Sequence, residues 1–219
     1  IGVRLVGSEM CIRDSKGMRR AQMKLFVGFD FGTDSLLARK ITGFRKRFDP
    51  KYKSYSFAHM AMLAPFESLD YQAIDLAETL KEELETFFYG KGDRPKLGLT
   101  GLGIYQQKRK NIIYLNPHYD IDLEHCLEFV QDICSACMAP KIKYKPNQKQ
   151  FIPLGYFNNE TELNLIMDQA KMEFRNYGEI PVESISLYEK KGNQWVKRET
   201  LIDFDSKQHD FLHLNNQSL

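Results

Sequence analysis

The feature that most constrains the fold is an order of predicted elements that occurs in both halves of the chain. Apolar spacing and turn residues predict a helix, an apolar strand, a second helix and two further strands, and then the same order again. The predicted helices cover residues 34–48, 70–88, 120–138 and 160–175, and the predicted strands cover residues 24–30, 56–64, 96–105, 111–116, 149–157, 180–189 and 194–203. Since no low-complexity linker separates the halves, we expect an α+β fold with two pseudo-symmetric lobes, each a small and mostly antiparallel sheet with outer helices, and a cleft between the lobes.

The start and the end of the chain do not follow this pattern. Residues 9–15 match the translation of a transposon-end adapter used in sequencing libraries, and the surrounding segment lacks apolar periodicity. We therefore expect residues 1–22 to be a non-native leader and residues 23–204 to form the bilobal domain. Residues 205–219 are expected to be a polar tail.

The charge balance excludes a strong general attraction to polyanions. The chain has 31 Lys and Arg residues against 29 Asp and Glu residues. Residues 1–22 hold five of the basic and two of the acidic residues, which leaves 26 against 27 in the rest. No global attraction to nucleic acid or anionic lipid follows from such a balance. No apolar run approaches the ~20 residues of a membrane-spanning helix, so no membrane partner is expected.

The cysteines indicate a reducing compartment. Cys126, Cys134 and Cys137 are the cysteines beyond the expected leader, and no secretory signal is recognisable. We therefore expect reduced thiols and a cytoplasmic setting. Cys134 and Cys137 have C-x-x-C spacing, but they lack a second ligand pair and fall on the apolar face of a predicted helix. This favours buried apolar residues over a metal or redox site, and neither a metal nor a cofactor is predicted.

Three segments, in this order, carry a resemblance to a known family. A predicted helix ends in residues 45–52, an apolar strand with His59 follows at residues 57–62, and residues 185–200 form the last predicted hairpin. Together they resemble the 2H phosphoesterase superfamily, often labelled 2'-5' RNA ligase or cyclic nucleotide phosphodiesterase, over residues 23–204. In that family each lobe contributes a strand with a histidine and, two residues later, Thr or Ser. The resemblance implies that the two motif strands face each other across a groove.

The resemblance also implies an acid–base mechanism with two histidines, and this chain has only some of the residues for it. One histidine acts as base and the other as acid, and the hydroxyl donates to a phosphoryl oxygen without help from a metal. His59 matches the first histidine, but Ala61 occupies the hydroxyl position. On its pattern alone, a single histidine in an apolar strand is more often a hydrogen-bonded core residue than a catalyst.

The second motif falls in residues 149–157 and contains no histidine in either of two possible registers. One register sets Phe151 and Pro153 on the histidine and threonine positions, and the other sets Leu154 and Tyr156 there. The catalytic pair is therefore degraded in both registers.

Further binding candidates lie around the second motif. Lys145 and Lys149 precede it and are candidates for lining a phosphate groove, although alternate lysines also protect exposed edge strands. Tyr156 is a candidate for stacking on a base.

Three functions remain open. The leading hypothesis is a 2H phosphoesterase-like protein that binds a nucleotide or an RNA-end phosphate with little or no turnover. The alternative is an active, metal-independent cyclic phosphodiesterase or RNA ligase-like enzyme that uses His59 with a non-histidine partner such as Tyr156. A structural or protein-interaction relic is the third hypothesis.

Overall fold

A computed structural model of the protein describes residues 22–33, 35–50, 52, 58–91, 94–107, 110–137, 150–158, 160–175, 178–192 and 194–204. Within these residues the helices are α1 (Leu36–Phe48), α2 (Asp70–Phe87), α3 (Ile121–Cys137) and α4 (Glu160–Glu173). The strands are β1 (Gln22–Asp30), β2 (His59–Ala61), β3 (Phe66–Leu69), β4 (Lys96–Gln107), β5 (Lys110–His118), β6 (Ile152–Phe157), β7 (Glu179–Pro181), β8 (Ser184–Lys191) and β9 (Gln194–Asp203). The predicted tail and all but the last residue of the predicted leader lie outside the described residues.

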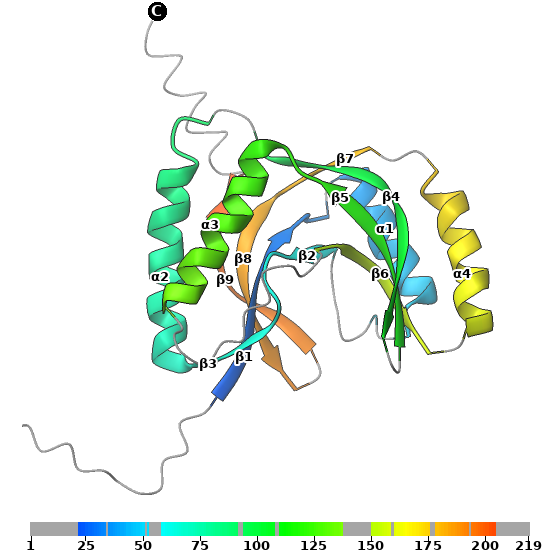
Figure 1. Ribbon diagram of the computed structural model, residues 1–219, viewed down its shortest axis with the longest axis horizontal. Coiled ribbons are helices and arrows are strands. Elements are labelled where there is room, and N and C mark those ends of the chain that lie inside the picture. The colour runs from blue at the N-terminus through cyan, green and yellow to red at the C-terminus, as the bar shows by residue number, and fades with distance from the viewer. Residues whose placement is uncertain are drawn as a thin grey trace, which may run out of the picture.

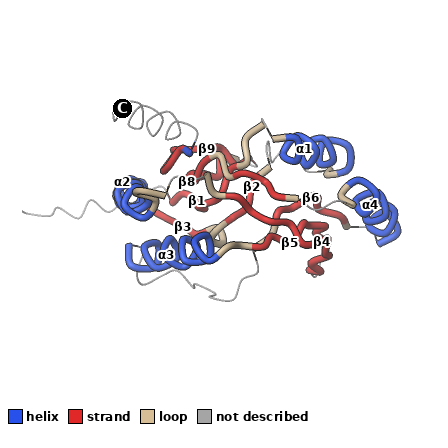
Figure 2. The backbone as a smooth tube through the Cα atoms, turned by 90° about the horizontal axis from the view of Figure 1, so that it is seen from above, coloured by secondary structure: helices blue, strands red, loops and turns tan. Residues whose placement is uncertain are grey.

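The strands form two antiparallel sheets, so the predicted α+β fold is confirmed (Figure 1). Sheet A has the order β2-β1-β8-β9, with β3 also paired to β1, and sheet B has the order β6-β5-β4-β7. The helices lie in two pairs at opposite ends of the molecule, with the strands between them (Figure 2). α2 packs against α3 and β9, whereas α1 contacts β6 and α4 contacts β5 and β6. Each sheet therefore has one face covered by helices and one helix-free face.

The two halves are built alike, but their boundary differs from the predicted one. In chain order, β1, α1, β2, α2 and β4 correspond to β5, α3, β6, α4 and β8. Each half places its second strand beside its first, as β2 beside β1 and β6 beside β5. The last strand of each half crosses to the other sheet, so that β8 pairs with β1 and β4 pairs with β5. The boundary between the halves thus lies within the β4–β5 hairpin, not after it.

The strand predicted over residues 56–64 is shorter than expected and is followed by a strand that was not predicted. β2 covers His59–Ala61, the backbone turns, and β3 begins at Phe66. Pro65 lacks an N–H group and cannot continue the hydrogen-bond ladder. β1 is long enough to pair with β2 at its end and with β3 at its beginning.

The apolar core lies between the sheets and their helices. Leu25, Val27 and Phe29 alternate along β1 and are fully buried on the helix-covered face. Phe26, Gly28 and Asp30 take the other positions of the same strand and point to the helix-free face. This alternation decides which residues of sheet A are available for a functional site.

The cysteines agree with the sequence analysis except at one position. Cys126 and Cys134 are buried in α3, and burial raises the pKa of each thiol to about 12. Cys137 is exposed, so the prediction that it is buried was wrong, because the last turn of α3 leaves the core.

Among the described residues, no helix is long and apolar enough to cross a membrane. The same residues contain no group of three or more His, Cys, Asp or Glu side chains arranged to hold a metal ion.

Candidate functional site

The first motif lies on the helix-free face of sheet A. β2 pairs with the end of β1, and the register sets His59 opposite Asp30 and Ala61 opposite Gly28. Residues opposite one another in an antiparallel pair share a face. The histidine and hydroxyl positions of the motif therefore point away from the helices.

His59 lies at the margin of an aromatic cluster. Its ring stacks on Phe26 with 5.4 Å between centroids and lies 6.1 Å from the Tyr188 ring. Trp195 meets Phe26 edge-on, with 4.8 Å between the ring centroids. Gly28 makes this arrangement possible, because a Cβ atom there would come within 2.9 Å of the Phe26 ring and 2.8 Å of a backbone carbonyl. His59 is 8% exposed, so little of the residue is open to a ligand.

A buried carboxylate stands directly beside this histidine. Asp30 Oδ2 accepts from Lys197 Nζ at 2.6 Å and from the Tyr188 hydroxyl at 3.2 Å, and Asp30 Oδ1 accepts from the Gly32 amide at 2.9 Å. Burial, reinforced by the Asp30 carboxylate, raises the pKa of the Tyr188 phenol well above its ordinary value, so Tyr188 stays a protonated donor. Three donors from three parts of the chain thus fix the orientation of one carboxylate.

Two serines complete the polar part of this face. Ser184 is opposite Asp30 and Ser186 is opposite Gly28, and their hydroxyl oxygens are 3.0 Å apart. Both side chains are buried. They therefore lie beside Asp30 and Gly28 on the same face, with almost no surface open to solvent.

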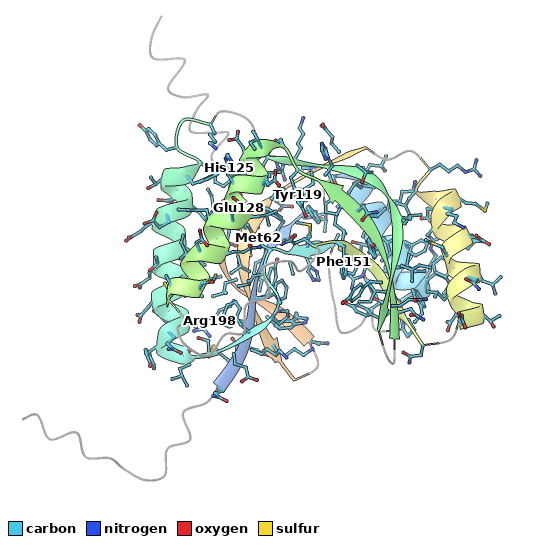
Figure 3. All side chains as sticks on the ribbon, in the orientation of Figure 1. Met62, Tyr119, His125, Glu128, Phe151 and Arg198 are labelled. Carbon is cyan, nitrogen blue, oxygen red and sulfur yellow. The ribbon has the colours of Figure 1, made fainter. Side chains whose placement is uncertain are left out.

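The helix-free face of sheet B is aromatic. The Tyr114 ring lies across Gly103, where any Cβ atom would overlap it. Phe151 lies over Tyr114 with 4.8 Å between ring centroids and is 6.0 Å from the Tyr105 ring. Figure 3 places Phe151 beside β4 and β5, just before β6 begins. Tyr105 is exposed and Phe151 is half-buried, whereas Tyr114 is buried, so two aromatic rings are accessible next to the second motif.

The residues of the second motif do not all share one face. Pro153 pairs with Tyr114, and Tyr156 pairs with Ile112. Tyr114 and Ile112 are two residues apart on β5 and share its helix-free face, so Pro153 and Tyr156 lie on that face as well. Leu154 is the extra residue of a β-bulge and is fully buried in the core. Pro153 is tolerated here because β6 is the edge strand of sheet B.

The two motif strands adjoin in the middle of the molecule. β2 and β6 are in contact, and Gln150, just before β6, donates to the carbonyl oxygen of Met62, just after β2, at 3.3 Å. Gln131 of α3 donates to the same oxygen at 3.1 Å. Figure 3 places Met62 and Tyr119 in this region, and the Tyr119 hydroxyl lies 3.5 Å from the Met60 sulfur. The junction therefore brings the two motifs close to each other.

The structure adds residues that the sequence analysis did not identify. Lys145 and Lys149 lie outside the described residues. Asp30, Tyr188 and Lys197 form a cluster that was not expected, although the last two belong to the segment that carried the family resemblance. Tyr188 lies 158 residues from Asp30 in the sequence, so no local pattern predicts their contact.

Comparisons with known proteins do not assign the chain to a family. No family model matches it, and no curated protein matches it. Similar solved structures include Usb1 from Kluyveromyces marxianus, alone and with uridine monophosphate, and a conserved protein of unknown function from Agrobacterium tumefaciens. Their identities are 10%, 10% and 12%, and their TM-scores are 0.48, 0.46 and 0.45. The matches cover 80%, 81% and 83% of this chain and 96%, 97% and 86% of those chains. At such identities and TM-scores, the likeness supports no statement about the activity of this chain.

Proposed function

We propose that this protein is a 2H phosphoesterase-like protein that binds a nucleotide, or the phosphate at an RNA end, with little or no turnover. The observation that carries the proposal is the meeting of β2 and β6. β2 and β6 hold the two motif positions, and of these two strands only β2 contains a histidine. Since acid and base work on a cyclic phosphate is divided between two groups, one histidine supports recognition far better than catalysis.

The aromatic rings favour a nucleotide over a free phosphate. Sheet A presents the half-buried Trp195 ring, which packs on the buried Phe26, and sheet B presents Tyr105 and Phe151, with Tyr114 buried beneath Phe151. Stacking of a base on an aromatic side chain contributes about 1–3 kcal/mol and tolerates any base. These rings fit a ligand that carries a base together with its phosphate.

The position of the second motif supports the register with Phe151 and Pro153. Pro153 lies on the helix-free face, and Phe151 packs on Tyr114 of that face. The other register would need Leu154 at the histidine position, and Leu154 is buried in the core. The proposal therefore takes Phe151 and Pro153 as the residues that replace the second catalytic pair.

The proposal is tested by calorimetric titration of the purified protein. The probes are uridine 2',3'-cyclic monophosphate, uridine, and a short RNA that ends in a 2',3'-cyclic phosphate. We expect the phosphate-bearing probes to bind in this titration. In thermal unfolding, they should also raise the melting temperature of the protein as their concentration increases, because a ligand that binds the native state stabilises that state. Replacing His59 with alanine is expected to weaken this binding about tenfold or more, as a hydrogen bond to a charged group is lost.

The control is His125→Ala, which removes an exposed imidazole from α3 (Figure 3). This variant should bind as tightly as the wild type. If the wild type binds none of the probes, the structural relic becomes the better hypothesis. If His59→Ala binds as tightly as the wild type, the ligand site does not include β2.

A further inference from the structure

Lys197 differs from an ordinary surface lysine in the way it is held. Its ammonium group lies 2.6 Å from Asp30 Oδ2, and the side chain is 39% exposed whereas that of Asp30 is 8% exposed. A pair of two exposed side chains would be free to separate. Here the carboxylate is fixed by Tyr188 and by the Gly32 amide, so the ammonium group is tethered to a rigid point and still faces solvent.

The tethered ammonium group lies on the same face as His59. Lys197 pairs with Tyr188 across β8 and β9, and Asp30 pairs with His59 across β1 and β2. All four residues therefore belong to the helix-free face of sheet A, with Asp30 between Lys197 and His59. Asp30, which pairs with Lys197 and lies opposite His59, therefore connects the ammonium group to the histidine on this face.

The donor count leaves room for an anion. A lysine ammonium group has three N–H donors, and in the described part of the chain Asp30 is the one carboxylate that pairs with Lys197. The remaining N–H donors of the ammonium group can be offered to a phosphoryl oxygen. Asp30 accepts from Lys197, Tyr188 and the Gly32 amide, and its side chain is 8% exposed, so little of the carboxylate faces an incoming anion.

We propose that Lys197 binds the phosphate of the nucleotide ligand and that Asp30 is the positioning residue that holds the ammonium group beside His59. The proposal rests on the proposed function, because it names the residue that recognises the phosphate in the same site. It also gives the site a cation in the absence of a second histidine. The residue comes from β9, outside both motif strands.

The first test measures affinity. Lys197→Met keeps the length of the side chain and removes the charge, and Lys171→Met is the matched control, since Lys171 pairs with Asp168 at 3.0 Å on the outside of α4. We expect Lys197→Met to weaken uridine 2',3'-cyclic monophosphate about ten- to a hundredfold, the range for a lost hydrogen bond to a charged group. Binding of uridine, which has no phosphate, should change less than about threefold in the same variant. Lys197→Arg should keep most of the phosphate affinity, because it restores the charge.

The second test needs no substitution and therefore does not depend on how the variants fold. Acetylation of lysines in the wild-type protein is followed by mass spectrometry, with and without the cyclic nucleotide. Ligand should slow the acetylation of Lys197 and leave that of Lys171 unchanged.

The outcomes separate the two proposals. Binding by the wild type with unchanged affinity in Lys197→Met, or with no protection of Lys197, overturns this inference and leaves the proposed function in place. If the wild type does not bind uridine 2',3'-cyclic monophosphate, both the proposed function and this inference are overturned. Equal loss of cyclic nucleotide and uridine in Lys197→Met would show a structural role for the lysine and would also overturn the inference.

Discussion

Replacing Asp49 with alanine is expected to lower the free energy of unfolding by about 3–5 kcal/mol, because the change leaves a buried guanidinium without its carboxylate. Arg45 and Asp49 are both buried, 3.5 Å apart, at the end of α1. Burial lowers the pKa of the Arg45 guanidinium, and the Asp49 carboxylate opposes that effect. Asp49 also packs against Gly155 of β6, so the pair joins α1 to the second motif strand. The measurement is urea-induced unfolding of the variant and the wild type.

Two further variants show whether the loss comes from the unpaired charge. Arg45→Met combined with Asp49→Ala removes both charges and is expected to recover most of the stability that the single variant loses. Lys171→Ala breaks an exposed pair on α4 and should change the stability by less than about 1 kcal/mol. A single-variant loss of less than about 1 kcal/mol would contradict the assignment of this pair as the link between α1 and β6.

The helices and most strands were predictable because their signals are local. Apolar residues at helical spacing marked α2 and α3 to within one residue of their observed ends. The antiparallel hairpins β4–β5 and β8–β9 were marked by polar turns between apolar runs. In each case the residues that decide the structure lie within a few positions of one another.

The exchange of strands between the sheets was not predictable in the same way. β1 pairs with β8, which lies more than 150 residues away in the sequence. No pattern in either segment predicts this pairing. The cluster of Asp30, Tyr188 and Lys197 follows directly from that pairing. The sequence could identify the motif strands, but it could not identify the residues that the crossing brings beside them.

Hydrolysis of 2',3'-cyclic phosphates by the wild-type protein is expected to lie orders of magnitude below that of an intact histidine pair. Loss of a general acid or base typically reduces a rate about 10²–10⁴-fold, and loss of a donor to the developing charge has a comparable effect. These reductions need not multiply, because such groups act as a unit. The measurement is turnover between about pH 5 and pH 9, the range in which histidine changes its protonation.

On the proposed function, adding the histidine and the hydroxyl groups that the two motifs lack should raise the rate. The variant is Phe151→His with Pro153→Thr, combined with Ala61→Thr in β2. A histidine at position 151 can keep the contact with the Tyr114 ring, which now lies 4.8 Å from the Phe151 ring. Turnover should appear in this variant and should require His59, so that a further His59→Ala change abolishes it.

The second register provides the matched control. Leu154→His with Tyr156→Thr introduces the same residue types, but it replaces a fully buried leucine of the core. This variant should be less stable and should gain no activity, since its imidazole would lie on the helix-covered side of β6. Robust turnover by the wild type that His59→Ala abolishes would contradict the degraded pair and favour an active phosphodiesterase. Weak turnover that His59→Ala leaves unchanged would not depend on His59 and would point to a contaminating enzyme.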